Sequence, residues 1–137
     1  KPSDLIEANK IFLKNILKKN KAFDYSDIKL KNKINGQIIY GVNSAINNSI
    51  INGPVIIGDN VVIENSIIGP NVSLSNNCKV INSTIENSII MSNTSFLNIK
   101  QTIKNSLLGH NISINQKTDF LNEINLIIGD QGKIELT

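Results

Sequence analysis

The sequence predicts an all-β coil of about five turns, preceded by one N-terminal α-helix. The main observation is an internal repeat, because the chain from Gln37 onward matches itself when it is shifted by 17 residues. Within each 17 residues, large aliphatic side chains recur in steps of six, six and five, and Gly or Asn separates them. Three near-equal segments per period indicate a triangular coil with one short strand on each side and a turn at each corner.

The repeat also predicts which side chains fill the core. One aliphatic residue on each side should point inward, and successive turns should stack these residues into one continuous core. The alignment places Ile57 with Leu74 and Met91, and it also groups the following residues: Ile63, Val80, Leu97 and Ile114; Val61 and Cys78; and Ser49, Ser66 and Ser83. We expect the core positions to include Ile57, Ile63, Ile68, Leu74, Val80 and Ile85, and we expect the three serines to form a hydrogen-bonded ladder.

The corners carry residues that suit tight turns. A recurring tetrapeptide consists of an aliphatic residue, a small residue, a variable residue and often Asn, as in Leu108 to Asn111. Asn enters the left-handed backbone region more easily than other non-Gly residues, and Pro70 followed by Asn71 predicts a type II turn. The coil should extend from about Gln37 to Gly129, and loops should leave it at Asn98–Thr102 and Asn115–Asn125.

The first 36 residues predict a helix and a connecting segment. Residues 3–19 have a helix start at Pro2 and Ser3, and most of their apolar side chains share one arc that Asn9 interrupts. The arc contains Leu5, Ile6, Phe12, Leu13, Ile16 and Leu17. Residues 20–36 show no clear period and predict a linker with one short strand. We therefore divide the chain into a linker region, 1–36, and a coil domain, 37–137.

Charge is distributed unevenly between these regions. Residues 1–36 contain nine Lys and four acidic residues, a net of +5, whereas residues 37–137 contain five Lys and seven acidic residues, a net of −2. A basic arm can bind nucleic acid or an anionic membrane, but the chain contains no Arg and few aromatic residues. We favour a solvated helix face, and we expect no nucleic-acid or membrane partner.

Other features restrict the cellular context. The lone Cys78 excludes an internal disulfide and favours a reducing, cytoplasmic compartment. No apolar run is long enough to span a bilayer, and no signal peptide is visible. The chain begins with Lys1 instead of Met, which suggests a fragment of a longer protein.

Several strings resemble a known family. The hexapeptide steps with Gly or Asn at the corners resemble the left-handed parallel β-helix of hexapeptide-repeat proteins. The strings "GPVIIGDNVVIENSIIGPNVSLSNNCKVINSTIENSIIMSNTSF", "IKNSLLGHNISI" and "LIIGDQGKIEL" resemble the C-terminal domain of long-form glucose-1-phosphate thymidylyltransferases. The string "KPSDLIEANKIFL" resembles the segment that joins the nucleotidyltransferase domain of that family to its β-helix.

The resemblance implies a parent enzyme that joins a sugar 1-phosphate to a nucleoside triphosphate with Mg²⁺ and releases pyrophosphate. The Gly-rich nucleotide loop and both metal-binding Asp residues of that family lie upstream of the part that this chain matches. The resemblance therefore implies a non-catalytic domain for assembly, support or regulation, with the parent's catalytic domain and further copies of the chain as partners. It implies no cofactor in this fragment.

Few residues could carry chemistry of their own. In related β-helix acyltransferases a coil His acts as a base toward an acceptor, with acyl-CoA bound between coils, so His110 is the catalytic candidate of an alternative acyltransferase function. Against this, His110 occupies the corner position that Asp59, Pro70 and Asn76 hold elsewhere, which indicates a solvent-facing turn. Cys78 aligns with an apolar position and predicts a buried thiol, and the scattered acidic residues predict no metal site.

The helix is the predicted place of assembly. Its six arc residues, Leu5, Ile6, Phe12, Leu13, Ile16 and Leu17, would form an unusual apolar patch if they stayed exposed on a monomer. We expect the helix to pair with another copy, and the alternative is that it folds back on the coil.

Overall fold

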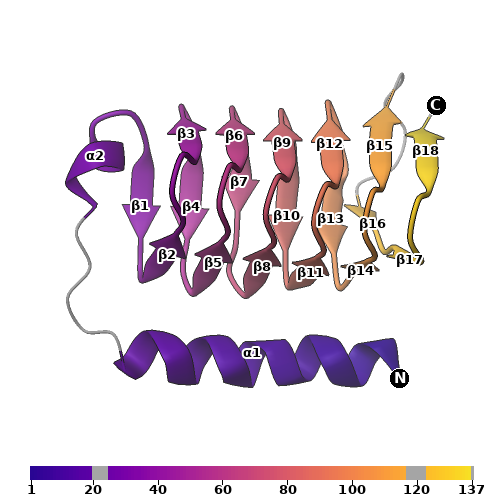
Figure 1. Cartoon of the computed structure of the whole chain (residues 1–137), viewed down its shortest axis with the longest axis horizontal. Helices are drawn as coiled ribbons and strands as arrows, with labels where there is room; N and C mark the ends of the chain where they lie inside the picture. The colour runs from indigo at the N-terminus through magenta and orange to yellow at the C-terminus, as the bar shows by residue number, and fades with distance from the viewer. Residues whose placement is uncertain (20–24, 117–122, 137) are drawn as a thin grey trace.

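The chain folds into a parallel β-solenoid with one long helix along its side. The computed structural model describes residues 1–19, 25–116 and 123–136. Three parallel sheets form the sides of the coil, and each contains one strand from every turn (Figure 1). Each sheet has six strands, so the coil has about six turns instead of the five that we predicted.

The strands contain two to four residues each, and the sheets are named here A, B and C. Sheet A contains β1 (Lys33–Asn35), β4 (Ile50–Asn52), β7 (Ile67–Ile68), β10 (Thr84–Glu86), β13 (Thr102–Lys104) and β16 (Glu123–Ile124). Sheet B contains β2 (Ile38–Tyr40), β5 (Val55–Ile57), β8 (Val72–Leu74), β11 (Ser88–Ile90), β14 (Leu107–Leu108) and β17 (Ile127–Ile128). Sheet C contains β3 (Ala45–Asn47), β6 (Val62–Glu64), β9 (Lys79–Ile81), β12 (Ser95–Leu97), β15 (Ser113–Gln116) and β18 (Lys133–Leu136).

The predicted core positions are confirmed. In these short strands inward side chains alternate with outward ones, so β6 and β10 contribute their middle residue to the core, whereas β5 and β8 of sheet B contribute their first and third. Ile63 pairs with Val80, and Ile68 pairs with Ile85, in neighbouring turns. The six predicted positions are all buried, namely Ile57, Ile63, Ile68, Leu74, Val80 and Ile85.

The alignment fails in the fourth turn, where it is one residue out of register. Leu74 pairs with Ile90 instead of Met91, and Val80 pairs with Phe96 instead of Leu97. The cause is a shorter corner, because Ile85 and Ile90 are five residues apart whereas Ile68 and Leu74 are six apart. Phe96 is therefore in the core, and Leu97 is partly exposed.

The extra residues at Asn98–Thr102 restore the register. We predicted a loop that leaves the coil there, but Ile99 and Gln101 within it are buried. The segment is therefore a longer corner that packs inward. In the second predicted loop, residues 115–116 belong to β15 and residues 123–124 to β16, while 117–122 lie outside the described residues.

Asn residues form the corners, as predicted. Twelve of the thirteen described non-Gly residues with positive φ are Asn, including Asn60, Asn77 and Asn93 at equivalent corners of successive turns. Asn71 has φ of 62°, the positive φ that the predicted turn requires of its second central residue, and the Gly69–Pro70 peptide bond is cis. Gly69 itself has φ of 98°, and a Cβ there would lie 1.8 Å from the Asn52 carbonyl oxygen.

Two helices precede the coil. Helix α1 (Pro2–Lys19) agrees with the predicted helix, and the short α2 (Ser26–Lys29) was not predicted. Strand β1 lies within the segment that we assigned to the linker and begins the first turn. Helix α2 covers the N-terminal end of the core with the buried side chain of Ile28.

Candidate functional site

The long helix packs lengthwise against the outer surface of sheet B. It contacts β8 and β11, and it follows the axis of the coil (Figure 1). Ile6, Leu13 and Leu17 of α1 are buried, so one apolar stripe of the helix is covered by its own chain. Within one chain, α1 therefore folds back on the coil, which is the alternative that we considered.

Asn9, which seemed to interrupt the apolar arc, has a specific partner. Its Oδ1 accepts a hydrogen bond of 2.8 Å from the hydroxyl of Ser73 in β8. Ser73 is the polar member of the outward-facing column of sheet B, whose other members are Ile39, Ile56, Ile89, Leu107 and Ile127. A polar residue on the helix thus meets the polar residue of the column, which fixes the position of α1 along the coil.

A second apolar surface of α1 remains in solvent. Leu5, Ile11 and Phe12 are between 53% and 59% exposed. We name Leu5, Ala8, Ile11, Phe12 and Asn15 the outer face of α1; Ala8 and Asn15 are also exposed. Of the six predicted interface residues, Leu5 and Phe12 are on this outer face, Ile6, Leu13 and Leu17 are buried against the coil, and Ile16 is half-buried.

His110 lies at a corner between sheets B and C. Its Nδ1 is 2.7 Å from the Ser92 hydroxyl in the preceding turn, and its backbone N–H donates to the Asp130 carboxylate at 2.7 Å. The same corner column contains Asp59 and Asn76, where the Asp59 N–H donates to the Asn76 side chain at 2.8 Å. These contacts form a polar ladder from turn to turn.

Two details of the His110 site correct or limit what we predicted. Pro70 belongs to a corner between sheets A and B, so it does not share the His110 column as we predicted. Although Ser92, His110 and Asp130 are the residue types of a catalytic triad, the Asp130 carboxylate holds the backbone of His110, whereas a triad acid orients the imidazole ring. This geometry favours a structural role for His110.

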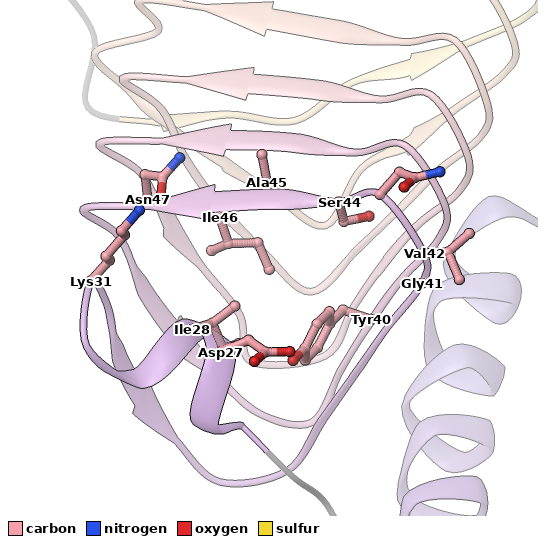
Figure 2. Close-up of a pocket in the computed structure, with 11 residues that line it drawn as sticks. Asp27, Ile28, Lys31, Tyr40, Gly41, Val42, Ser44, Ala45, Ile46 and Asn47 are labelled. Atoms are coloured by element: carbon pink, nitrogen blue, oxygen red, sulfur yellow. The ribbon is translucent and has the colours of Figure 1, made fainter.

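A hollow of about 600 Å³ lies at the N-terminal end of the coil. Figure 2 shows α2 on one side of it and β3 on the other, with the corner at Gly41 and Val42 next to α1. Eleven residues line it: Asp27, Ile28, Lys31, Tyr40, Gly41, Val42, Asn43, Ser44, Ala45, Ile46 and Asn47. The mixture of one acidic, one basic and several neutral side chains indicates no particular ligand class.

Side chains close the strand edges beside this hollow. The Tyr25 hydroxyl accepts the Ile38 N–H at 2.8 Å and donates to the Ile38 carbonyl at 3.2 Å. Asn32 donates to the Ile46 carbonyl in β3 at 2.7 Å. Capped edges resist the addition of another strand, so we interpret this end as a cap of the coil.

Cys78 is buried, as predicted, and its thiol donates to the Met91 carbonyl at a sulfur–oxygen distance of 3.2 Å. Burial raises the pKa of this thiol, so it remains protonated and unreactive at neutral pH. Among residues 1–19, 25–116 and 123–136, no group of three or more His, Cys, Asp or Glu residues could hold a metal ion.

Comparisons with known proteins do not assign the chain to a family. No protein-family model matches the sequence, and no curated protein is significantly similar to it. No helix in the described part of the chain has the length and hydropathy needed to cross a membrane.

Proposed function

We propose that this chain is the non-catalytic C-terminal domain of a sugar-1-phosphate nucleotidyltransferase, in particular a glucose-1-phosphate thymidylyltransferase that makes dTDP-glucose. The observation that carries the proposal is the packing of α1 on sheet B, because it makes the helix and the coil one unit. In the family that the sequence resembles, the equivalent helix joins the catalytic domain to a β-helix. A helix fixed to the coil would hold a preceding domain at a defined position.

The geometry indicates where that domain would lie. Helix α1 runs back along the coil, so its N-terminus is beside the last turns (Figure 1). Ser3 and Ile127 of β17 line one hollow of about 360 Å³, which places the first helical turn against the end of sheet B. A catalytic domain attached before Lys1 would therefore contact or overhang the C-terminal turns of the coil.

The reaction and its Mg²⁺ belong, in this proposal, to the upstream domain. Among the described residues no group of three or more His, Cys, Asp or Glu could hold a metal ion, so in this proposal the upstream domain binds the Mg²⁺. Their role is assembly, support or regulation of the parent. A cytoplasmic location suits the proposal because the unpaired Cys78 is compatible with a reducing compartment.

The test compares this chain with the product of the complete reading frame that encodes it. Both proteins are incubated with glucose 1-phosphate, dTTP and Mg²⁺, and pyrophosphate release is measured. We expect release by the longer protein and only background release by residues 1–137. The proposal would be refuted by a longer protein that is inactive with every sugar 1-phosphate and nucleoside triphosphate pair tested, or by activity of this chain without any upstream domain.

The second candidate function is a hexapeptide acyltransferase that uses acyl-CoA. The hydrogen bond between Ser92 and His110 favours it, because a hydroxyl at 2.7 Å helps to fix the orientation of the imidazole ring. Isothermal titration of the chain with acetyl-CoA separates the two proposals. Binding of acetyl-CoA that is lost in His110→Ala would support the acyltransferase function. If the chain does not bind acetyl-CoA at millimolar concentration, the accessory-domain function is favoured.

A further inference from the structure

We propose that the outer face of α1 binds the outer face of α1 in a second copy of this chain, with the two helices antiparallel. The surface consists of Leu5, Ala8, Ile11, Phe12 and Asn15. The inference rests on the proposed assembly role, and it names the residues that would carry that role. It differs from the arc that the sequence predicted, because half of that arc is buried against the coil.

The outer face points away from the coil. At 100° per residue, the centre of the outer face is about 160° around the helix from the stripe formed by Ile6, Leu13 and Leu17. Because that stripe contacts sheet B, the outer face is on the opposite side of α1 and is accessible to another molecule. Exposed apolar residues gathered on one helix face are unusual for a surface that contacts only water.

The spacing suits a helix partner. Leu5, Ala8, Phe12 and Asn15 follow each other in steps of three, four and three residues, which is the spacing of a coiled-coil seam. The seam is symmetric about position 10, so an antiparallel partner places Phe12 opposite the small Ala8 and Leu5 opposite Asn15. A large side chain opposite a small one allows two helices to approach closely.

The charges favour the antiparallel direction. Asp4 and Glu7 lie in the N-terminal part of α1, where they pair with the N-terminal amine and with Lys10 of the same chain, and Lys14 and Lys18 lie in its C-terminal part. In the antiparallel pair, Asp4 lies opposite the region between Lys14 and Lys18 of the second copy. A parallel pair would instead place like charges and like helix-dipole ends side by side.

The size of the contact predicts a weak dimer. Helix α1 has 18 residues and is about 27 Å long, so a helix-to-helix contact about 10 Å wide covers roughly 300 Å² per copy. Stable interfaces usually bury about 800 Å² per partner, so we expect a weak dimer whose population rises with protein concentration. In a longer protein, other contacts could add to this one.

Sedimentation equilibrium of residues 1–137 from about 5 μM to 1 mM tests the pairing in this concentration range. We expect concentration-dependent dimerisation, and we expect Leu5→Ser combined with Phe12→Ser to weaken it at least tenfold. The matched control is Ile67→Ser, which removes an exposed aliphatic side chain from sheet A and should leave the dissociation constant unchanged. A wild-type chain that is monomeric throughout, or a control as damaging as the double variant, would overturn the proposal.

Charge exchange tests the direction. Asp4→Lys and Lys18→Glu should each weaken the dimer, and the two changes together should restore it. If the combined variant dimerises as weakly as the product of the two single effects on the dissociation constant predicts, antiparallel pairing is contradicted. Circular dichroism of every variant checks that α1 remains helical. Sedimentation requires no catalytic activity, so failure of the pairing and failure of the proposed enzyme function are separate results.

Discussion

Replacing Ser66 by Ala should destabilise the coil more than its size suggests. The Ser66 hydroxyl donates to the Glu64 carbonyl at 2.8 Å and accepts the N–H of Ser83, one turn further on, at 3.2 Å. The N–H of Ser66 in turn donates to the Ser49 hydroxyl at 3.1 Å. All three serines are buried, so the predicted serine ladder is confirmed and water has little access to it.

The change leaves one backbone donor without its acceptor. The N–H of Ser83 loses the Ser66 oxygen in the interior, which costs about 1–3 kcal/mol. The Glu64 carbonyl loses a donor but belongs to an exposed residue, so its loss should contribute about 0.5 kcal/mol. We therefore expect the free energy of unfolding to fall by about 1.5–3.5 kcal/mol. For a chain of 137 residues this corresponds to a melting temperature lower by roughly 6–14 °C.

Urea titration followed by far-UV circular dichroism measures this difference. Ser113→Ala on the exposed surface of sheet C is the control, and it should change stability by less than about 0.5 kcal/mol. If Ser66→Ala costs no more than the control, the Ser83 N–H does not depend on the ladder, and our account of this corner is wrong.

Three further outcomes follow from single residues. Val80→Asp places a charge at a fully buried core position and should prevent folding, so a native circular dichroism spectrum from this variant would contradict the core assignment. Asn77 has φ of 62°, so Asn77→Ala should cost about 1 kcal/mol and Asn77→Gly less; the reverse order in urea titrations would show that this φ is not what stabilises the corner. The buried Cys78 thiol should react with a chromogenic disulfide reagent at pH 8 only after denaturant is added, and equal rates with and without denaturant would show that the site is open.

The core positions could be predicted because corner and strand lengths repeat. In the turns that contain Ile57 and Leu74, corresponding sides have the same length, so a fixed shift of 17 residues finds the inward residue. The method fails where two neighbouring residues are both apolar. Ile90 and Met91 fit the pattern equally well, as do Phe96 and Leu97, and only the length of the corner at Asn87 decides which one points inward.

The cap of the coil was missed for a different reason. Helix α2 has four residues, too few to show a helical period. Tyr25 and Ile28 each make a separate contact with the first turn, the former through a hydrogen bond and the latter through its buried side chain. The requirement for a cap follows from the fold, because the first turn of any solenoid leaves its core and strand edges uncovered. The identity of the capping residues depends on contacts that a repeat alignment does not include.

At the His110 site, the residue types alone could not predict which side chains are in contact. The sequence correctly placed His110 at a corner in the same column as Asp59 and Asn76, but it could not show the contact with Ser92. Ser92 and His110 are 18 residues apart, because the longer corner at Asn98–Thr102 lengthens this turn beyond the period of 17. A shift of one residue is enough to remove the pair from a fixed alignment.

The docking of α1 could have been predicted from the outward positions of sheet B. Ile39, Ile56, Ile89 and Leu107 face away from the core, and an aliphatic column on the outside of a sheet requires a cover. Helix α1 carries a stripe of matching length, and its one polar interruption, Asn9, faces the one polar member of the column, Ser73. An unsatisfied polar group at either position would be costly, so this pair selects one register of the helix among several that would bury similar apolar area. Burial of Ile6, Leu13 and Leu17 then determines which residues remain outside, and that remainder, with Leu5, Ile11 and Phe12, is the surface available to a partner.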